Sequence, residues 1–331
     1  MIFGPNFIKK AFKLEFEHTK IIAAIAYVII SYLIFYEGQY YIIEETGPYG
    51  VGRRTKIIKK EGYSLTLSIF YPIGKSTHIQ GMKDKTKTDA WYTSGYFGID
   101  SVAKVTRSLS WLQYQNCVFK VRAVNNVELH KDFANNHKKL TPIICSHGLT
   151  RNRHSLSFHI NEMVSYGCIV YSCDHTDLSC AAYTDHNTSE KIGYQEYDFS
   201  PDNKETQEEY RYKQLDIRVN KDFASIVELI KEEAQPDKLP CIDLEKLTAF
   251  GHSLGAMTAV HAAYTFPKDF KLCLAMDIYF KPMYQEIEGN DDYALTQPIC
   301  IITSENFHEL SSDKYKDGYN CDRTRNQFYD N

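Results

Sequence analysis

Short apolar runs alternate along the chain with segments whose apolar residues recur at helical spacing. The runs have the length of buried strands and cover residues 142–149, 168–175, 247–250, 270–276 and 299–303. Residues 64–71 predict a further strand, because polar and apolar positions alternate there. Residues 204–233 predict a long amphipathic helix whose charges lie on a solvated face, and the Ala-rich residues 256–263 predict another. This alternation predicts an α/β fold with a mostly parallel central sheet and helices on both faces. Pro72 is expected to end the first strand, and the polar residues 75–90 and 127–140 to form exposed loops.

The first 43 residues form a pattern of their own. Four lysines within residues 1–20 precede an uncharged apolar run at residues 21–36, which is shorter than the roughly 20 residues that cross a bilayer. The run fits a membrane anchor, a cleaved signal peptide of a secreted protein, or a buried or interfacial helix. The preceding lysines, and the lack of a small-residue cleavage site after the run, favour a single-pass anchor. We therefore expect a basic segment (1–20), a hydrophobic anchoring helix (21–43) and an α/β domain (45–331).

One stretch has the sequence of a nucleophile elbow. Residues 251–255 read Gly-x-Ser-x-Gly, between the strand predicted at 247–250 and the Ala-rich helix. The two glycines let strand and helix pack closely, which exposes the hydroxyl of Ser253 at the helix N-terminus. There the helix dipole and free N–H groups favour a developing oxyanion. A Gly-Ser turn before a helix is the alternative, but both flanks favour Ser253 as a nucleophile.

A serine nucleophile needs an oxyanion donor, an acid and a base. A strand that ends in His147-Gly148 is where hydrolases of this kind place a second backbone donor, and we expect the His147 imidazole only to order that loop. Asp277 follows the strand at 270–276, where the acid should lie, although such residues also cap helices. The base should come last in the chain, and beyond Asp277 the sequence contains only His308.

Composition narrows the function classes further. Hydrophobic residues make up 43% of the 331, enough to fill the core of one large domain, and a net charge of −4 gives no reason to expect nucleic acid as a partner. Nine cysteines without a Cys-x-x-Cys pair argue against a zinc site and against a dense disulfide framework. We expect no metal and no cofactor, and the sequence carries no signal for an oligomeric state.

The span from Gly47 to the end resembles the platelet-activating factor acetylhydrolase family, the plasma and type II intracellular phospholipases A2 of α/β-hydrolase fold. The matching pieces share their order along nearly the whole domain: Gly47-Pro48-Tyr49, Val51-Gly52, Phe70-Tyr71-Pro72, Trp91, Tyr96-Phe97-Gly98, Ser146-His147-Gly148-Leu149, Ser165-Tyr166-Gly167, Asp174-His175, Ser179, Tyr183, Gln214, Arg218, Gly251-His252-Ser253-Leu254-Gly255, Leu274-Ala275-Met276-Asp277, Ser304-Glu305 and Phe307.

The resemblance implies a role for each part of the site. It implies Ser253 as nucleophile, Asp277 as acid, and the backbone N–H groups of Leu149 and Leu254 as the oxyanion hole. It also implies calcium-independent hydrolysis of the sn-2 acetyl or short acyl ester of phospholipids, of the 1-alkyl-2-acetylglycerophosphocholine esterase type. Such a serine esterase would serve lipid degradation, with a phospholipid substrate taken at a membrane surface.

The family's histidine is the one member without a match. In the family it follows the Ser-Glu-x-Phe segment in a Gly-x-x-His stretch that these residues do not reach, and His308 falls at a position that the family does not use. Three interpretations follow: a C-terminus that is incomplete, a catalytically inactive relative acting as a lipid-binding or interaction module, or a base supplied by His308. The first is favoured, because His308 would have to reach Ser253 from a different loop.

Overall fold

The computed structural model describes residues 18–23, 25–30, 44–107, 117, 119–287, 293–305 and 307. An eight-stranded sheet runs through the domain in the order β10-β9-β8-β4-β5-β2-β1-β3, and β6 and β7 pair separately. The strands are β1 (Gly50–Lys60), β2 (Tyr63–Ile73), β3 (Val124–Asn125), β4 (Thr141–Ser146), β5 (Cys168–Asp174), β6 (Ala182–Asp185), β7 (Glu190–Gly193), β8 (Thr248–His252), β9 (Leu272–Met276) and β10 (Ile299–Ile302).

The helices fill the connections between the strands. The α-helices are α2 (Lys75–Met82), α3 (Gly95–Thr106), α4 (Lys131–Ala134), α5 (Ser157–Ser165), α6 (Gln207–Ile217), α7 (Ala224–Glu233), α8 (Leu254–Thr265) and α9 (Tyr284–Ile287). Short 3-10 turns are η1 (Lys85–Lys87), η5 (Leu244–Lys246) and η6 (Lys281–Met283). Between α6 and α7 lies η4 (Arg218–Phe223), which is a π-helix, so residues 207–233 form one continuous helical rod.

The predicted parallel sheet is confirmed. Strands β5, β4, β8, β9 and β10 are neighbours and run parallel, while β2 joins β5 antiparallel. Because the carboxyl ends of parallel strands meet at one edge, the loops after β4, β8 and β9 come together there. That edge carries the residues discussed below.

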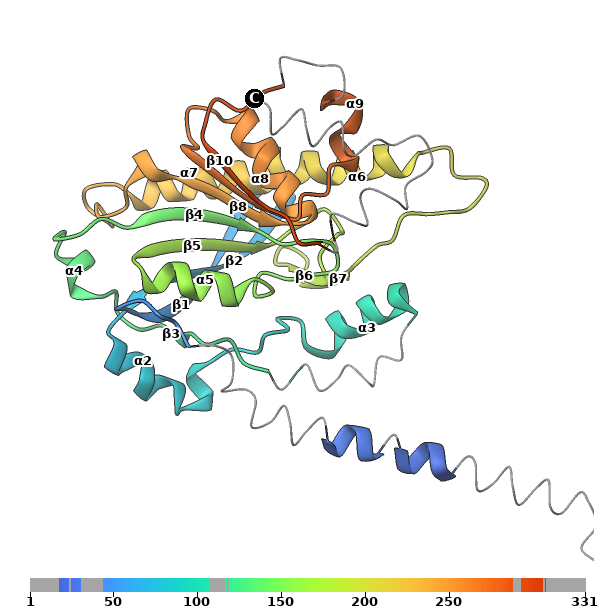
Figure 1. The fold of residues 1–331 in the computed structure, drawn as a ribbon, viewed down its shortest axis with the longest axis horizontal. Helices are drawn as coiled ribbons and strands as arrows, with labels where there is room; N and C mark the ends of the chain where they lie inside the picture. Colours follow the sequence, from blue (N-terminus) through green and yellow to red (C-terminus); the bar gives the residue numbers. More distant parts are fainter. Residues whose placement is uncertain are drawn as a thin grey trace, which may run out of the picture.

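Helices cover both faces of the sheet (Figure 1). Successive strand residues point to opposite faces, so Ile144 packs with the layer formed by α6, η4, α7 and α8, while Ile143 packs with α5. On the first face the apolar residues of the rod are fully buried at Leu215, Val219, Phe223, Ile226 and Ile230. This confirms the amphipathic helix predicted there and accounts for its spacing.

Several local expectations were wrong. Residues 75–90 contain α2 and η1, and residues 127–140 contain α4 with Phe133 buried. Helix α2 has no apolar stripe, because it packs through Gly81, where a Cβ would lie 2.6 Å from a methyl group of Val124. Strand β2 continues through Pro72, which is tolerated because β5 pairs only with residues 66–70.

The N-terminal segment is described in part. Residues 18–23 and 25–30 are helical, and isoleucines such as Ile22 and Ile30 are exposed. Residues 24 and 31–43 of the predicted anchor lie outside the described residues. Within the described part of the chain, no helix has the length and apolar character needed to cross a membrane.

Candidate active site

Ser253 lies at the turn between β8 and α8, with φ 59° and ψ −123°. A non-glycine residue rarely adopts a positive φ, and such strain marks functional sites. Backbone hydrogen bonds hold it there: its N–H donates to the carbonyl of Met276 on the next strand, and its carbonyl accepts from the N–H of Tyr279. The predicted strand–turn–helix elbow is therefore present.

The two glycines of the motif make this turn possible by close backbone contact. A Cβ on Gly251 would lie 2.0 Å from the carbonyl oxygen of Gly255, within the same turn. A Cβ on Gly255 would lie 2.1 Å from the carbonyl oxygen of Ser146, at the end of β4. No side chain fits at either position, so the motif brings α8 directly against β4 and its following loop.

Asp277 follows β9 and lies at the same edge of the sheet. Ser304, after β10, donates to its carboxylate from the backbone N–H at 2.6 Å and from the hydroxyl at 3.1 Å. The backbone of Asp277 has φ 49°, and its N–H donates to the carbonyl of Ile302. Two donors from one neighbouring residue thus fix the orientation of this carboxylate.

An imidazole already lies beside that carboxylate. The Nε2 atom of His252 is 3.6 Å from Oδ2 of Asp277, and its side chain is 38% exposed. Burial lowers the pKa of His252 from its ordinary value, with Arg151 acting in the same direction and Asp277 against it. The predicted alternative base, His308, lies outside the described residues.

The backbone N–H groups of Leu149 and Leu254, the two predicted oxyanion donors, are available to bind an oxygen. Leu254 begins α8 directly after Ser253, and the loop after β4 passes so close that a Cβ on Gly148 would lie 3.2 Å from Cβ of Ser253. Among the described residues, neither the N–H of Leu149 nor that of Leu254 donates a hydrogen bond. Unpaired N–H groups beside a serine at a helix N-terminus can stabilise negative charge on an oxygen bound there.

A family model described as "Platelet-activating factor acetylhydrolase, isoform II" matches residues 34–327. The chain belongs to this family. Platelet-activating factor acetylhydrolase of the dog, Canis lupus familiaris, is 23% identical over 300 residues, which cover 84% of this chain. The match covers 64% of that relative, so the chain spans slightly less than two thirds of its length.

A solved structure shares the architecture. Ferulic acid esterase from Streptomyces cinnamoneus matches with a TM-score of 0.54 at 12% identity, over 87% of this chain and 73% of that one. At this identity the likeness concerns the fold alone, and it confirms the α/β-hydrolase fold. In this member of the acetylhydrolase family the elbow follows β8, which lies between β4 and β9 in the parallel part of the sheet.

A buried polar network lies directly behind the elbow in this acetylhydrolase relative. Its centre is the fully buried ion pair between Arg218 of η4 and Asp177, with Nε 2.7 Å from Oδ2. The expectation that the charges of residues 204–233 face solvent was wrong here, because Arg218 and Asp222 both have 0% exposure. Arg218 and Asp222 lie on the same helix face as the apolar residues Leu215, Val219 and Phe223. This spacing is visible in the sequence and could have predicted that both are buried.

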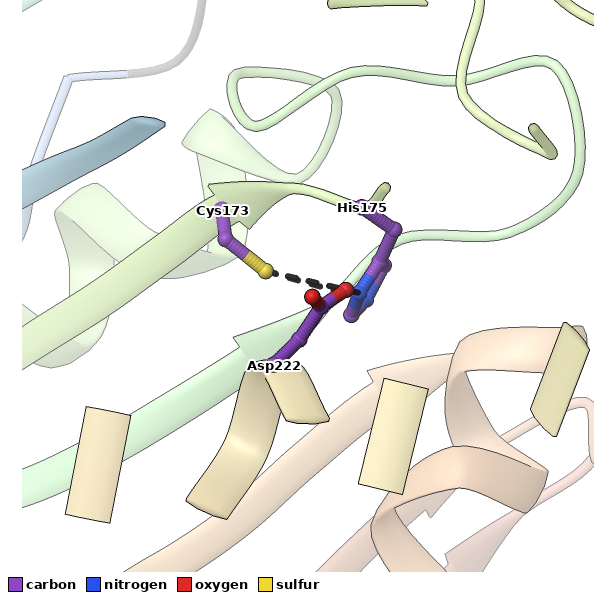
Figure 2. Close-up of side chains that lie close together, drawn as sticks. All are labelled: Cys173, His175 and Asp222. Atoms are coloured by element: carbon purple, nitrogen blue, oxygen red, sulfur yellow. Dashed lines mark hydrogen bonds and ion pairs between the residues drawn. The ribbon is translucent and has the colours of Figure 1, made fainter. Parts of the chain in front are cut away.

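Three ionisable side chains in this network lie close enough to bind a metal ion: Cys173 and His175 at the end of β5, and Asp222 on η4 (Figure 2). Hydrogen bonds already use both ring nitrogens of His175, Nδ1 at 2.7 Å from Asp222 and Nε2 at 2.8 Å from Ser146. The Cys173 sulfur lies 3.5 Å and 3.8 Å from the two nitrogens, over the ring face and not in line with a lone pair. The cluster is thus organised as a hydrogen-bonded network.

Burial sets the protonation states of the network. It lowers the pKa of His147 and of His175 well below the ordinary value, and Arg218 lowers both further, so both imidazoles are neutral near pH 7. It raises the pKa of Asp222 to about 7, with the charge of Asp177 acting in the same direction. Burial alone would raise the pKa of Asp177, but Arg218, His175 and the hydrogen bond from Ser179 together outweigh it, so the pKa of Asp177 is lowered.

Proposed function

We propose that this chain is a serine hydrolase of carboxylic esters. The observation that carries the proposal is the elbow: a strained Ser253 at the N-terminus of α8, beside two backbone N–H groups that make no other hydrogen bond among the described residues. Binding an ester carbonyl oxygen there puts its carbon against the serine hydroxyl. Membership of the platelet-activating factor acetylhydrolase family supports the same chemistry.

In the proposed reaction, Ser253 Oγ attacks the ester carbonyl carbon and its proton passes to an imidazole paired with Asp277. The amides of Leu149 and Leu254 bind the oxyanion, the alcohol leaves with that proton, and an acyl-enzyme remains. Water then releases the carboxylic acid by the same route. Ser304 contributes by holding Asp277, and no metal or cofactor takes part.

We assign phospholipids as the substrate class, with an acetyl or short acyl chain at the sn-2 position. The family supports this, as does the name of the dog relative. A substrate of this kind lies at a lipid surface, so we further propose that the basic N-terminal residues and the apolar segment at 21–43 bring the domain at 45–331 to a membrane.

The test is hydrolysis by the purified chain, first of an activated acetyl ester and then of phospholipids with sn-2 chains of increasing length. Ser253→Ala should abolish turnover and labelling by a fluorophosphonate. Ser225→Ala, which changes a buried serine on α7, should leave both unchanged. A probe that labels a residue other than Ser253 in the active protein would contradict the proposal.

Two further outcomes have distinct meanings. If wild-type protein binds phospholipid vesicles but neither hydrolyses esters nor reacts with the probe, the chain is a lipid-binding module and not an enzyme. If it is active, comparing His252→Gln with His308→Gln identifies the base, because only loss of the base removes the lower pKa from the pH dependence of kcat.

A further inference from the structure

The loop after β4 carries one of the two proposed oxyanion donors, and its geometry has an unusual origin. We name residues 147–151 the β4 loop. It lies beyond the last ladder pair of β4 with β8, at Ser146 and Gly251, so no strand partner fixes its peptide planes. A donor that acts in the transition state must nevertheless stay within a few tenths of an ångström of its place.

Arg218 supplies the missing contacts from behind. Its Nη1 donates to the carbonyl oxygen of His147 at 2.7 Å, its Nη2 donates to the hydroxyl of Ser179, and its Nε pairs with Asp177. The carbonyl of Ser179 in turn accepts from the N–H of Thr150 at 2.8 Å. One guanidinium therefore fixes the β4 loop on both sides of Leu149.

The peptide between these two points is also fixed. Nδ1 of His147 lies 2.7 Å from the carbonyl oxygen of Gly148, while its Nε2 accepts from the N–H of His175 at 3.3 Å. Because Nε2 is an acceptor, Nδ1 carries the proton and donates to Gly148. The Gly148–Leu149 peptide is planar and trans, so the Leu149 N–H points away from that carbonyl.

The π-helical segment η4 carries both residues that hold the β4 loop from behind, Arg218 and Asp222. Arg218 begins it, and Asp222, one turn later, shares a hydrogen bond with Nδ1 of His175, whose backbone N–H donates to the His147 ring. Within the described residues, π-helical geometry occurs only in η4, and such segments often mark functional sites. Because Arg218 is fully buried and paired with Asp177, contact with solvent cannot be the reason for a charged residue at this position.

We propose that Arg218 is a positioning residue that, with Asp177 and Ser179, holds the β4 loop so that the Leu149 N–H faces the oxygen bound at Ser253. The proposal rests on the ester hydrolysis proposed above. Arg218 touches no substrate; it acts only through the loop. Lysine could keep the ion pair with Asp177 but has no planar fork to reach His147 and Ser179 together.

The matched test compares Arg218→Lys with Arg122→Lys, because Arg122 is also buried and pairs with a carboxylate, that of Glu45, at 3.3 Å. Arg218→Lys should lower kcat at least tenfold with KM changed less than about twofold, since the donor acts in the transition state. Its affinity for a trifluoromethyl ketone analogue should fall in parallel with kcat/KM. Arg122→Lys should change neither.

A second measurement does not depend on turnover. Hydrogen–deuterium exchange of the Thr150 amide should become at least tenfold faster in Arg218→Lys and stay at the wild-type rate in Arg122→Lys. If Arg218→Lys fails to fold, Ser179→Ala replaces it, because that change removes one arginine contact and keeps the carbonyl that holds Thr150. Ser179→Ala should then lower kcat about threefold and speed the same exchange.

The outcomes separate the two proposals. If the wild type is inactive but exchange of its Thr150 amide becomes faster in Arg218→Lys, ester hydrolysis is refuted and the role of Arg218 in holding the β4 loop is supported. An active wild type with unchanged kcat, analogue affinity and exchange in the folded Arg218→Lys variant refutes the role of Arg218 alone. A uniform fall in active fraction, with normal kcat per titrated site, also overturns it, because it shows a purely structural effect.

Discussion

Replacing Gly255 with alanine tests the contact on which the whole site depends. The added Cβ would lie 2.1 Å from the carbonyl oxygen of Ser146 and 2.7 Å from that of His147. Both oxygens belong to backbone, so α8 and the end of β4 must separate by about 1 Å to reach an ordinary contact. Overpacking of this kind costs about 1–3 kcal/mol of stability.

The same displacement should reduce catalysis more than stability. It moves Ser253 relative to the β4 loop, and a misplacement of about 1 Å can cost about 100-fold in rate. We therefore expect kcat/KM for an acetyl ester to fall about 100-fold while the protein still folds, with a Tm lower by several degrees at about 2–4 °C per kcal/mol.

The control is Gly74→Ala at the N-cap of α2. Gly74 has φ −61°, and the nearest atom to an added Cβ there is the Thr77 hydroxyl at 3.3 Å, so both activity and Tm should stay near wild type. Steady-state kinetics and thermal unfolding of both variants decide the matter. A Gly255→Ala protein with wild-type kcat/KM and Tm would refute the close packing of α8 on β4.

Other predictions concern the acid, the pH and metals. Ser304→Ala should lower kcat several-fold at unchanged KM, because Asp277 loses its 3.1 Å hydroxyl donor but keeps the backbone one; wild-type kinetics would contradict this. The unfolding free energy should fall below about pH 6.5, by at least ~3 kcal/mol per pH unit, when measured by urea denaturation. The reason is that imidazoles with lowered pKa values bind protons only on unfolding: the fully buried His147, His154 and His175 have the largest shifts, and the lowered pKa values of His78 and His261 act in the same direction. Asp222 offsets one of them, because its pKa of about 7 lets the folded protein hold a proton that the unfolded chain has lost above about pH 4, and His154→Gln should reduce the slope by one proton. A chelator should leave activity and Tm unchanged; stoichiometric zinc in the purified protein would show that the Cys173 cluster binds metal after all.

The sheet was predictable where burial on two faces leaves a continuous apolar run. That condition holds for β4, β5 and β8, whose neighbours and covering helices hide both sides. It fails for β1, which the sequence did not predict, because its second half is exposed around Lys56 and its first half contains the buried Arg53. The sequence did not predict helix α2 for a related reason, because α2 packs through a glycine contact and has no apolar stripe.

The site divides in the same way. The elbow is local in sequence, so the motif alone predicts the conformation of Ser253 and the crowding at both glycines. The position of Asp277 follows from strand order, but its clamp by Ser304 depends on β10 lying beside β9, which no local pattern shows. Arg218 and Asp222 were predicted to face solvent because they are charged, although their spacing places both on the apolar stripe of their helix.

The charge at position 218 follows from the geometry of the β4 loop. A strand that ends at a catalytic edge gives up its ladder partners, which leaves the buried carbonyl of His147 in need of a donor. An apolar residue at position 218 would bury that carbonyl unsatisfied, and a neutral donor would reach one acceptor where Arg218 reaches several. The guanidinium reaches the carbonyl of His147 and the hydroxyl of Ser179 together, but a buried charge needs a counter-charge. Asp177, whose side chain is also 0% exposed, provides it. The polar interior of an otherwise apolar helix is thus required by a loop that has to stay open to substrate on its other side.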